Sequence, residues 1–192
     1  MQKSLSLLIA ALFAAGHAFA ADVPAADVQP LKAAVGALAG QLGAELKKEL
    51  STGTPESAIA VCKDAAPRIA GEISRQTGMK VTRVSLKTRN PMLGSPDAWE
   101  QAALQALDAR FAKGEKPETL EVAEVVTEPA GRSLRYLKAV PVQPLCLSCH
   151  GTPSDITPSL KEKLAAAYPH DRATGYSVGQ LRGAVSVKKA LD

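Results

Sequence analysis

The feature that most constrains this chain is the stretch PLCLSCHG at residues 144–151. Two cysteines flank Leu147 and Ser148, and His150 follows directly behind the second cysteine. The chain of 192 residues contains only three cysteines, so two of them stand within this single turn. The fold must therefore present Cys146, Cys149 and His150 together, close to whatever they bind.

Three kinds of site use cysteines at this spacing. A dithiol redox pair usually opens a helix beside a strand–helix unit, whereas this pair follows a predicted strand hairpin. A zinc site would need further ligands, and in the mature chain only Cys62 and His170 could complete it. The third is the attachment sequence Cys-x-x-Cys-His of c-type haem, in which the thiols form thioethers and the histidine binds the iron. Only the haem interpretation uses all three residues, so the sequence favours it.

The first 20 residues predict a secretory signal peptide. Lys3 gives a positive start, residues 5–16 are almost continuously apolar, and AFA at residues 18–20 is a small-residue cleavage site. The apolar run is shorter than the roughly 20 residues that span a bilayer. We therefore expect cleavage after Ala20 and a soluble periplasmic protein that does not span a membrane. Export agrees with the haem interpretation, because c-type haem is attached outside the cytoplasm.

Composition and motifs argue against two other classes of function. The formal net charge is a mild +4, without an arginine cluster interleaved with aromatic residues, so nucleic acid is not an expected partner. The sequence has no recognisable Ser/His/Asp arrangement, phosphate-binding loop or paired carboxylates, and no distal acid–base residues of a peroxidase can be identified. We therefore expect a protein that is not an enzyme.

The order of predicted elements favours an α+β fold, with helices first and an antiparallel sheet later. We expect a disordered lead-in at residues 21–30 and one domain over residues 31–192. Apolar spacing and capping signals predict helices over residues 31–50, 54–73, 95–114 and 158–167. Alternating residues predict strands over 79–86, 119–128, 133–142 and 181–187, with a loop at 88–95. Pro67 must kink or restart the second helix just after Cys62.

The spacing of residues in the sequence does not by itself identify the second iron ligand, on the side opposite His150. Met79 begins a strand and is better explained as core, and His170 lies in a polar loop typical of a solvated histidine. Met92 follows Asn90 and a proline in a loop, which makes it a credible ligand. Cys62 lies on an apolar helical face, where a buried inert cysteine is an equally good explanation.

Four stretches carry a resemblance to a known family: AVCKDAAPRIA, RVSLKTRNP with PDAWE, YLKAVPVQPLCLSCHG and DRATGYSVGQLRGAVSV. From about residue 31 to the end, the chain resembles the single-haem PAS-like sensor-domain family, which includes a cyanobacterial cytochrome-like protein and periplasmic parts of membrane receptors. The resemblance implies a PAS-like antiparallel sheet flanked by helices and one haem c per chain, with His150 and Cys62 as axial ligands. One departure is the MLGS segment around Met92, where a slightly shorter segment with asparagine is expected.

Basic residues in the second stretch are candidates for contacts with haem propionates. Arg83, Lys87 and Arg89 share one face of the predicted strand and its extension, although a solvated basic face explains them equally well. Tyr176 could line the same pocket, but a packing role suits it better.

A cysteine thiolate opposite histidine stabilises ferric iron, so we expect a low reduction potential that falls further as pH rises. Release of Cys62 on reduction would open a site for CO or NO and move its helix. This favours a redox or gas sensor that signals to a separate partner protein. The alternative is a periplasmic electron-transfer cytochrome without a sensory role.

Overall fold

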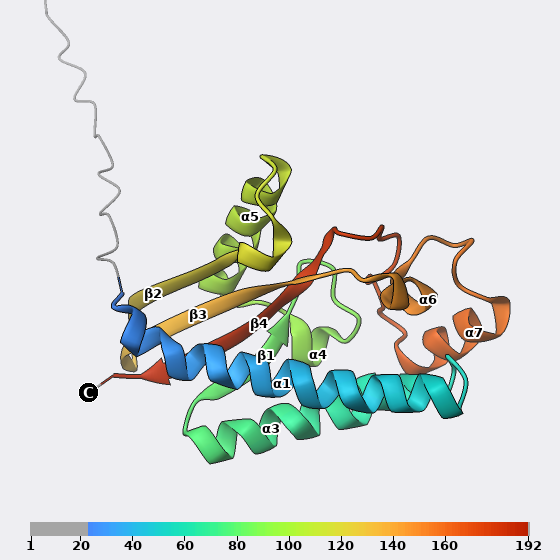
Figure 1. Ribbon diagram of the computed structural model, residues 1–192, viewed down its shortest axis with the longest axis horizontal. Coiled ribbons are helices and arrows are strands. Elements are labelled where there is room, and N and C mark those ends of the chain that lie inside the picture. The colour runs from blue at the N-terminus through green and yellow to red at the C-terminus, as the bar shows by residue number, and fades with distance from the viewer. Residues whose placement is uncertain (1–22, 192) are drawn as a thin grey trace, which may run out of the picture.

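A computed structural model describes residues 23–191, and the predicted signal peptide lies outside the described residues. The N-terminal part is helical, and a π-helical turn separates its second and third helices: α1 (Ala25–Thr52), α2 (Ala58–Ala60), η1 (Val61–Ala65) and α3 (Ala66–Thr77). Four strands follow along the chain: β1 (Lys80–Val84), β2 (Glu121–Glu128), β3 (Gly131–Pro141) and β4 (Leu181–Ala190). They form one antiparallel sheet in the order β1-β4-β3-β2. Figure 1 shows α1 and α3 side by side along this sheet.

Shorter elements fill the connections between the strands. Between β1 and β2 lie α4 (Pro91–Gly94), α5 (Ala98–Ala112) and the 3-10 turn η2 (Pro117–Thr119). Between β3 and β4 lie η3 (Pro144–Cys146), α6 (Leu147–His150) and α7 (Pro158–Ala167). The prediction of a PAS-like α+β fold with N-terminal helices first is confirmed. Within residues 23–191, no helix combines the length and apolar character that crossing a membrane requires.

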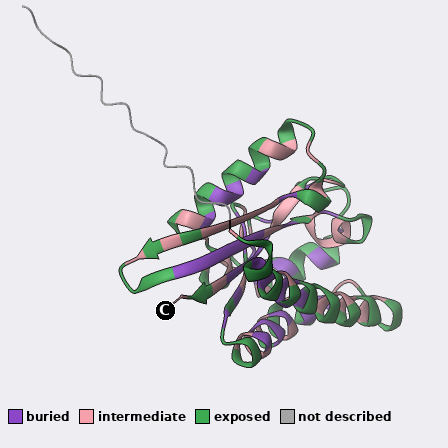
Figure 2. Cartoon of the chain, turned by 60° about the vertical axis from the view of Figure 1, so that its left-hand side comes forward, coloured by how far each residue is buried: buried purple, intermediate pink, exposed green. Residues whose placement is uncertain are grey.

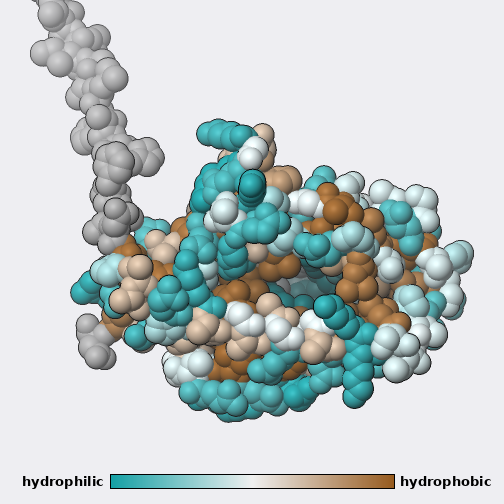
Figure 3. All heavy atoms as spheres, in the orientation of Figure 1, coloured by the Kyte–Doolittle hydropathy of each residue, from teal (hydrophilic) through white to brown (hydrophobic). Residues whose placement is uncertain are grey.

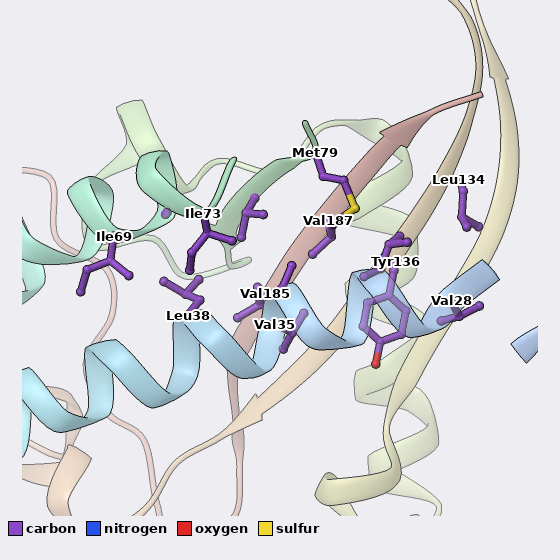
Figure 4. Close-up of a cluster of buried hydrophobic side chains, with 14 residues drawn as sticks. Val28, Val35, Leu38, Ile69, Ile73, Met79, Leu134, Tyr136, Val185 and Val187 are labelled. Atoms are coloured by element: carbon purple, nitrogen blue, oxygen red, sulfur yellow. The ribbon is translucent and has the colours of Figure 1, made fainter. Parts of the chain in front are cut away.

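The sheet is buried on both faces, because successive residues of a strand point to opposite sides. On one face, Leu134 and Tyr136 of β3 pack with α1 and α3. On the other face, Leu137 and Ala139 pack against α5. Figure 2 shows the buried residues gathered in the middle of the sheet, and Figure 4 shows the first of these clusters. The outer side of α3 carries a row of hydrophilic side chains, as Figure 3 shows, so this helix is amphipathic.

Helix α1 begins earlier than the sequence predicts. Residues 25–30 were expected to be disordered, but they are the first turns of α1, so this part of the prediction is wrong. Pro30, the last residue of the expected lead-in, lies inside the helix. Near the N-terminus its missing N–H removes one helical hydrogen bond, and burial of Val28 and Leu31 against the sheet offsets this loss.

The chain changes helical register at Cys62, as the position of Pro67 predicts. The π-helical turn η1 holds Cys62 and is followed at once by α3, whose first turn contains Pro67. Pro67 has no N–H to donate to the carbonyl of Lys63, so a regular α-helical ladder cannot run through this point. π-Helical turns are rare in proteins overall, but those that occur are often found at functional sites.

Packing between α1 and α3 yields a stability prediction. Leu38 is 1% exposed and lies beside Ile69 and Ile73 in Figure 4. Leu38→Ala should lower the free energy of unfolding by about 2–5 kcal/mol, because it leaves a cavity between the two helices. Urea titration of the mature protein measures this change.

A glycine on the outer side of α1 provides the control. A Cβ on Gly40 would meet no atom within 4 Å, so an alanine fits there without a clash. Gly40→Ala should raise the free energy of unfolding by about 0.5–1 kcal/mol through better helix propensity. Equal effects of the two substitutions would contradict this account of α1.

Candidate functional site

Strand β3 carries the cysteine motif to one end of the sheet. After β3 the backbone is held by Val142, whose N–H donates to Gln180 O at 2.8 Å. The turns η3 and α6 then form one short helical segment, which ends at Gly151. The N–H of Gly151 donates to Leu147 O at 2.8 Å, and a Cβ at this position would lie 2.6 Å from the same oxygen. Glycine is therefore required directly behind the motif.

The loop at residues 171–176 grips the backbone of the motif. The N–H of Tyr176 donates to His150 O at 3.0 Å, and the N–H of Gly175 donates to Gly151 O at 2.7 Å. These two bonds fix the orientation of the turn that carries the histidine. The motif is therefore held from outside as well as by its own helical turn.

The His150 ring is fixed by a hydrogen bond to the same loop. Its Nδ1 lies 2.6 Å from Ala173 O, and the Nε of Arg182 lies 3.2 Å from the same nitrogen. The carbonyl oxygen can only accept, so the shorter contact assigns the proton to Nδ1. This leaves Nε2 with its lone pair, in the arrangement that metal-binding histidines commonly have.

The surroundings keep the His150 imidazole neutral. Burial is the largest cause that lowers the pKa of His150, to about 2, and the positive charges of Arg182 and Arg89 add to it. A neutral imidazole is the form that binds a metal ion. The edge of the ring also meets Tyr176, with the ring centroids 6.4 Å apart.

Arg89 clamps the loop to the motif. It is 8% exposed, and its Nε donates to Asp171 Oδ2 at 3.0 Å. Its Nη2 donates to Cys149 O and, at 3.5 Å, to Ala173 O. One buried guanidinium thus connects the second cysteine with the carbonyl that orients His150.

Arg182 and Lys87 complete the framework behind the motif. Nη1 of Arg182 donates to Ser85 Oγ at 2.9 Å and to Lys87 O at 3.1 Å. The ammonium of Lys87 donates to Thr174 O at 2.6 Å and lies 4.4 Å from the centroid of the Tyr176 ring. Tyr176 is 7% exposed between these cations, in agreement with the packing role that the sequence favours. Lys87 lines a different pocket from Arg83 and Arg89, so the three basic side chains do not form one group.

A cavity of about 460 Å³ lies beside the motif, a size typical of cofactor and ligand sites. It is bordered by η1 and α3, by β1 and α4, and by the start of β4. Among the residues that line it in the described part of the chain there is no Asp or Glu. Its charged lining residues are all cations: Lys63, Lys80, Arg83, Arg89 and Arg182. Such a lining suits a ligand that carries carboxylates.

Cys62 and His150 line this same cavity. All three cysteines are free thiols. Burial raises the pKa of the Cys149 thiol; the charge of Arg89 lowers it, and those of Cys62 and Cys146 raise it further. The Cys149 thiol therefore lies near both of the other cysteines. The structure brings the isolated upstream cysteine to the motif, and this donor set fits a haem held by two thioethers and two axial ligands.

The other residues considered as iron ligands lie elsewhere. Met92 is 91% exposed on α4 and does not line the cavity, because Asn90 caps the helix and turns this position outward. Met79 is 5% exposed in the core, as expected, and His170 is exposed. Of the candidates opposite His150, the structure brings Cys62 to the cavity and leaves Met92 in solvent.

The two arginines proposed for propionates differ in their surroundings. Arg83 is exposed, lines the cavity and makes no ion pair with any residue of the described range. Its Nη2 donates to Cys62 O at 3.4 Å. Arg89 lines the cavity too, but most of its donors are used by Asp171 and the backbone. A propionate contact stays a prediction for both.

The sequence interpretation missed three residues of the site. Asp171 and Arg182 lie within the stretch DRATGYSVGQLRG, so the resemblance contained a signal for them. Tyr168 lines the cavity, and no local pattern marks it. For a zinc site, residues 23–191 offer no group of three or more His, Cys, Asp or Glu side chains that could hold a metal ion.

Comparison with known proteins agrees with this geometry. The family model described as Tll0287-like matches residues 10–189. The chain belongs to the Tll0287-like family. Among solved structures it is similar to the cyanobacterial heme-protein Tll0287, with a TM-score of 0.60 and 28% identity over 87% of this chain and 94% of that one. No curated protein matches the chain significantly.

The Arg89 clamp gives a second stability prediction. The side chains of Arg89 and Asp171 are 9% and 12% exposed. Arg89→Met should lower the free energy of unfolding by about 3–5 kcal/mol, because it leaves a buried carboxylate without its cation and the Cys149 carbonyl without its donor. Urea titration measures this loss in the mature protein.

Arg83→Met is the matched control, since Arg83 lines the same cavity but is exposed and makes no ion pair. It should change the free energy of unfolding by no more than about 0.5 kcal/mol. If both substitutions proved equally mild, Arg89 would not be the clamp of this loop.

Proposed function

We propose that this protein is an exported single-haem c-type protein whose haem, bound by His150 and Cys62, senses redox state or a diatomic gas. The observation that carries the proposal is the shared cavity of Cys62 and His150, next to two further free cysteines in the Cys-x-x-Cys-His spacing. Membership of the Tll0287-like family, with a heme-protein as its solved relative, supports it. The proposal includes no enzymatic activity.

Each residue of the site has a defined part in this proposal. Cys146 and Cys149 would form the thioethers, and His150 would offer Nε2 to the iron while its Nδ1 stays on Ala173 O. The exposed Arg83 is available to a propionate, since it makes no ion pair within the described residues. When bound, haem c would supply a one-electron couple and, where an axial position is free, a site for CO or NO. The stoichiometry is one haem per chain.

Cys62 is the residue through which a signal would start. A thiolate ligand would favour the oxidised state of the iron, hence a low potential. One-electron reduction by a donor protein would weaken the hold on Cys62, which would leave as a thiol after taking a proton from solvent. Because Cys62 lies in a π-helical turn directly before α3, its release would move that turn.

The second candidate is a periplasmic electron carrier, which one haem on a single domain also suits. The sensory role is favoured by the position of Cys62 at the junction of two helices, since a carrier has no use for a ligand that shifts an element. Fast exchange with cytochromes and no ligand-dependent change in shape would instead favour the carrier. Export rests on the signal-peptide pattern of residues 1–20.

The test compares the wild type with Cys62→Ser after production in cells that attach c-type haem. The wild type should show the ferric absorption spectrum of a thiolate-ligated haem and should bind CO when reduced. Cys62→Ser should keep the covalent haem, lose the thiolate spectrum and have a higher reduction potential, because the anionic ligand is gone. Identical spectra and potentials for the two proteins would show that Cys62 is not a ligand.

A further inference from the structure

Tyr168 is a buried polar residue that the proposed ligand set does not use. It follows α7, is 6% exposed, and lines the cavity that Cys62 and His150 share. Its N–H and carbonyl are bonded within the chain, through Leu164 O and Asp171 N. Its hydroxyl makes no hydrogen bond to any residue of the described range, and it is not sealed in the protein interior. The hydroxyl is therefore accessible to solvent and free to donate to a group that occupies the cavity.

The packing around Tyr168 brings it to the Cys62 side of the site. Tyr168 belongs to a small core with Leu160 and Leu164, and Ile59 packs against that core. Ile59 lies one helical turn before Cys62, so the same face of the helix contacts the Tyr168 cluster and leads to the cysteine. The charge of Cys62 also acts on Tyr168, in agreement with this proximity.

The hydroxyl of Tyr168 remains a donor at neutral pH. A tyrosine phenol ordinarily titrates at about pH 10, so it keeps its proton at neutral pH. The Arg89 guanidinium lies 5.8 Å from the ring centroid and holds the ring from one side. The ring is thus fixed, while its hydroxyl is free to bond into the cavity.

We propose that Tyr168 donates a hydrogen bond to the Cys62 thiolate and so sets how firmly Cys62 is held. This inference rests on the proposed ligation by Cys62. A hydrogen bond to a ligating sulfur withdraws negative charge from the metal and raises its reduction potential. Tyr168 is therefore a positioning and tuning residue that makes the release of Cys62 easier on reduction. It does not bind the iron itself.

The experiment is a redox titration of haem-loaded Tyr168→Phe, which keeps the ring and removes the donor. We expect a potential about 59 mV lower than that of the wild type, a tenfold change in the one-electron equilibrium constant. In a Cys62→Ser background the same substitution should produce no shift, because the accepting sulfur is absent. Tyr136→Phe, which removes a hydroxyl bonded to Glu121 in the core, is the matched control and should leave the potential unchanged.

An unchanged potential in Tyr168→Phe, or an equal shift with and without Cys62, would overturn the inference. The second of these results would mean that Tyr168 acts on another group of the site or only through packing. Cys62→Ser alone reports on the proposed ligation. Failure of the proposed function is therefore seen without reference to Tyr168, and the two failures are distinguishable.

Discussion

The hydrogen bond from Nδ1 of His150 to Ala173 O is the interaction on which the site depends. It selects the tautomer, aims Nε2 away from the loop, and ties residues 171–176 to the cysteine motif. Arg89 secures the same junction by bonding both Asp171 and the carbonyl of Cys149. A motif that is local in the sequence thus becomes a rigid donor set through contacts with a segment that follows it by about 20 residues.

Charge organises the cavity around this donor set. The lining within the described residues contains cations and no carboxylates, so it suits a ligand that carries carboxylates. The same cations oppose protonation of His150, which keeps its ring able to bind a metal. Burial and these positive charges therefore act in the same direction on the pKa of His150. The π-helical turn at Cys62 adds an element that a change in ligation can displace.

Much of the fold and the motif could be predicted because their signals are local. The capping box of Asp97 and the Thr157 cap define the starts of α5 and α7, and the spacing of Cys146, Cys149 and His150 indicates its own chemistry. The start of α1 was missed because Pro30 resembles a boundary until the burial of Val28 is known. The clamp by Arg89 and the open hydroxyl of Tyr168 arise from packing between distant segments, which no local pattern encodes. Pairing Cys62 with the motif required the family resemblance or the fold.

The most direct test of this account is the intact mass of the exported protein from cells able to attach c-type haem. The account predicts one haem bound covalently to the peptide that contains Cys146 and Cys149, and a coloured protein that keeps its colour after denaturation. A colourless protein at the mass of the bare polypeptide would contradict it.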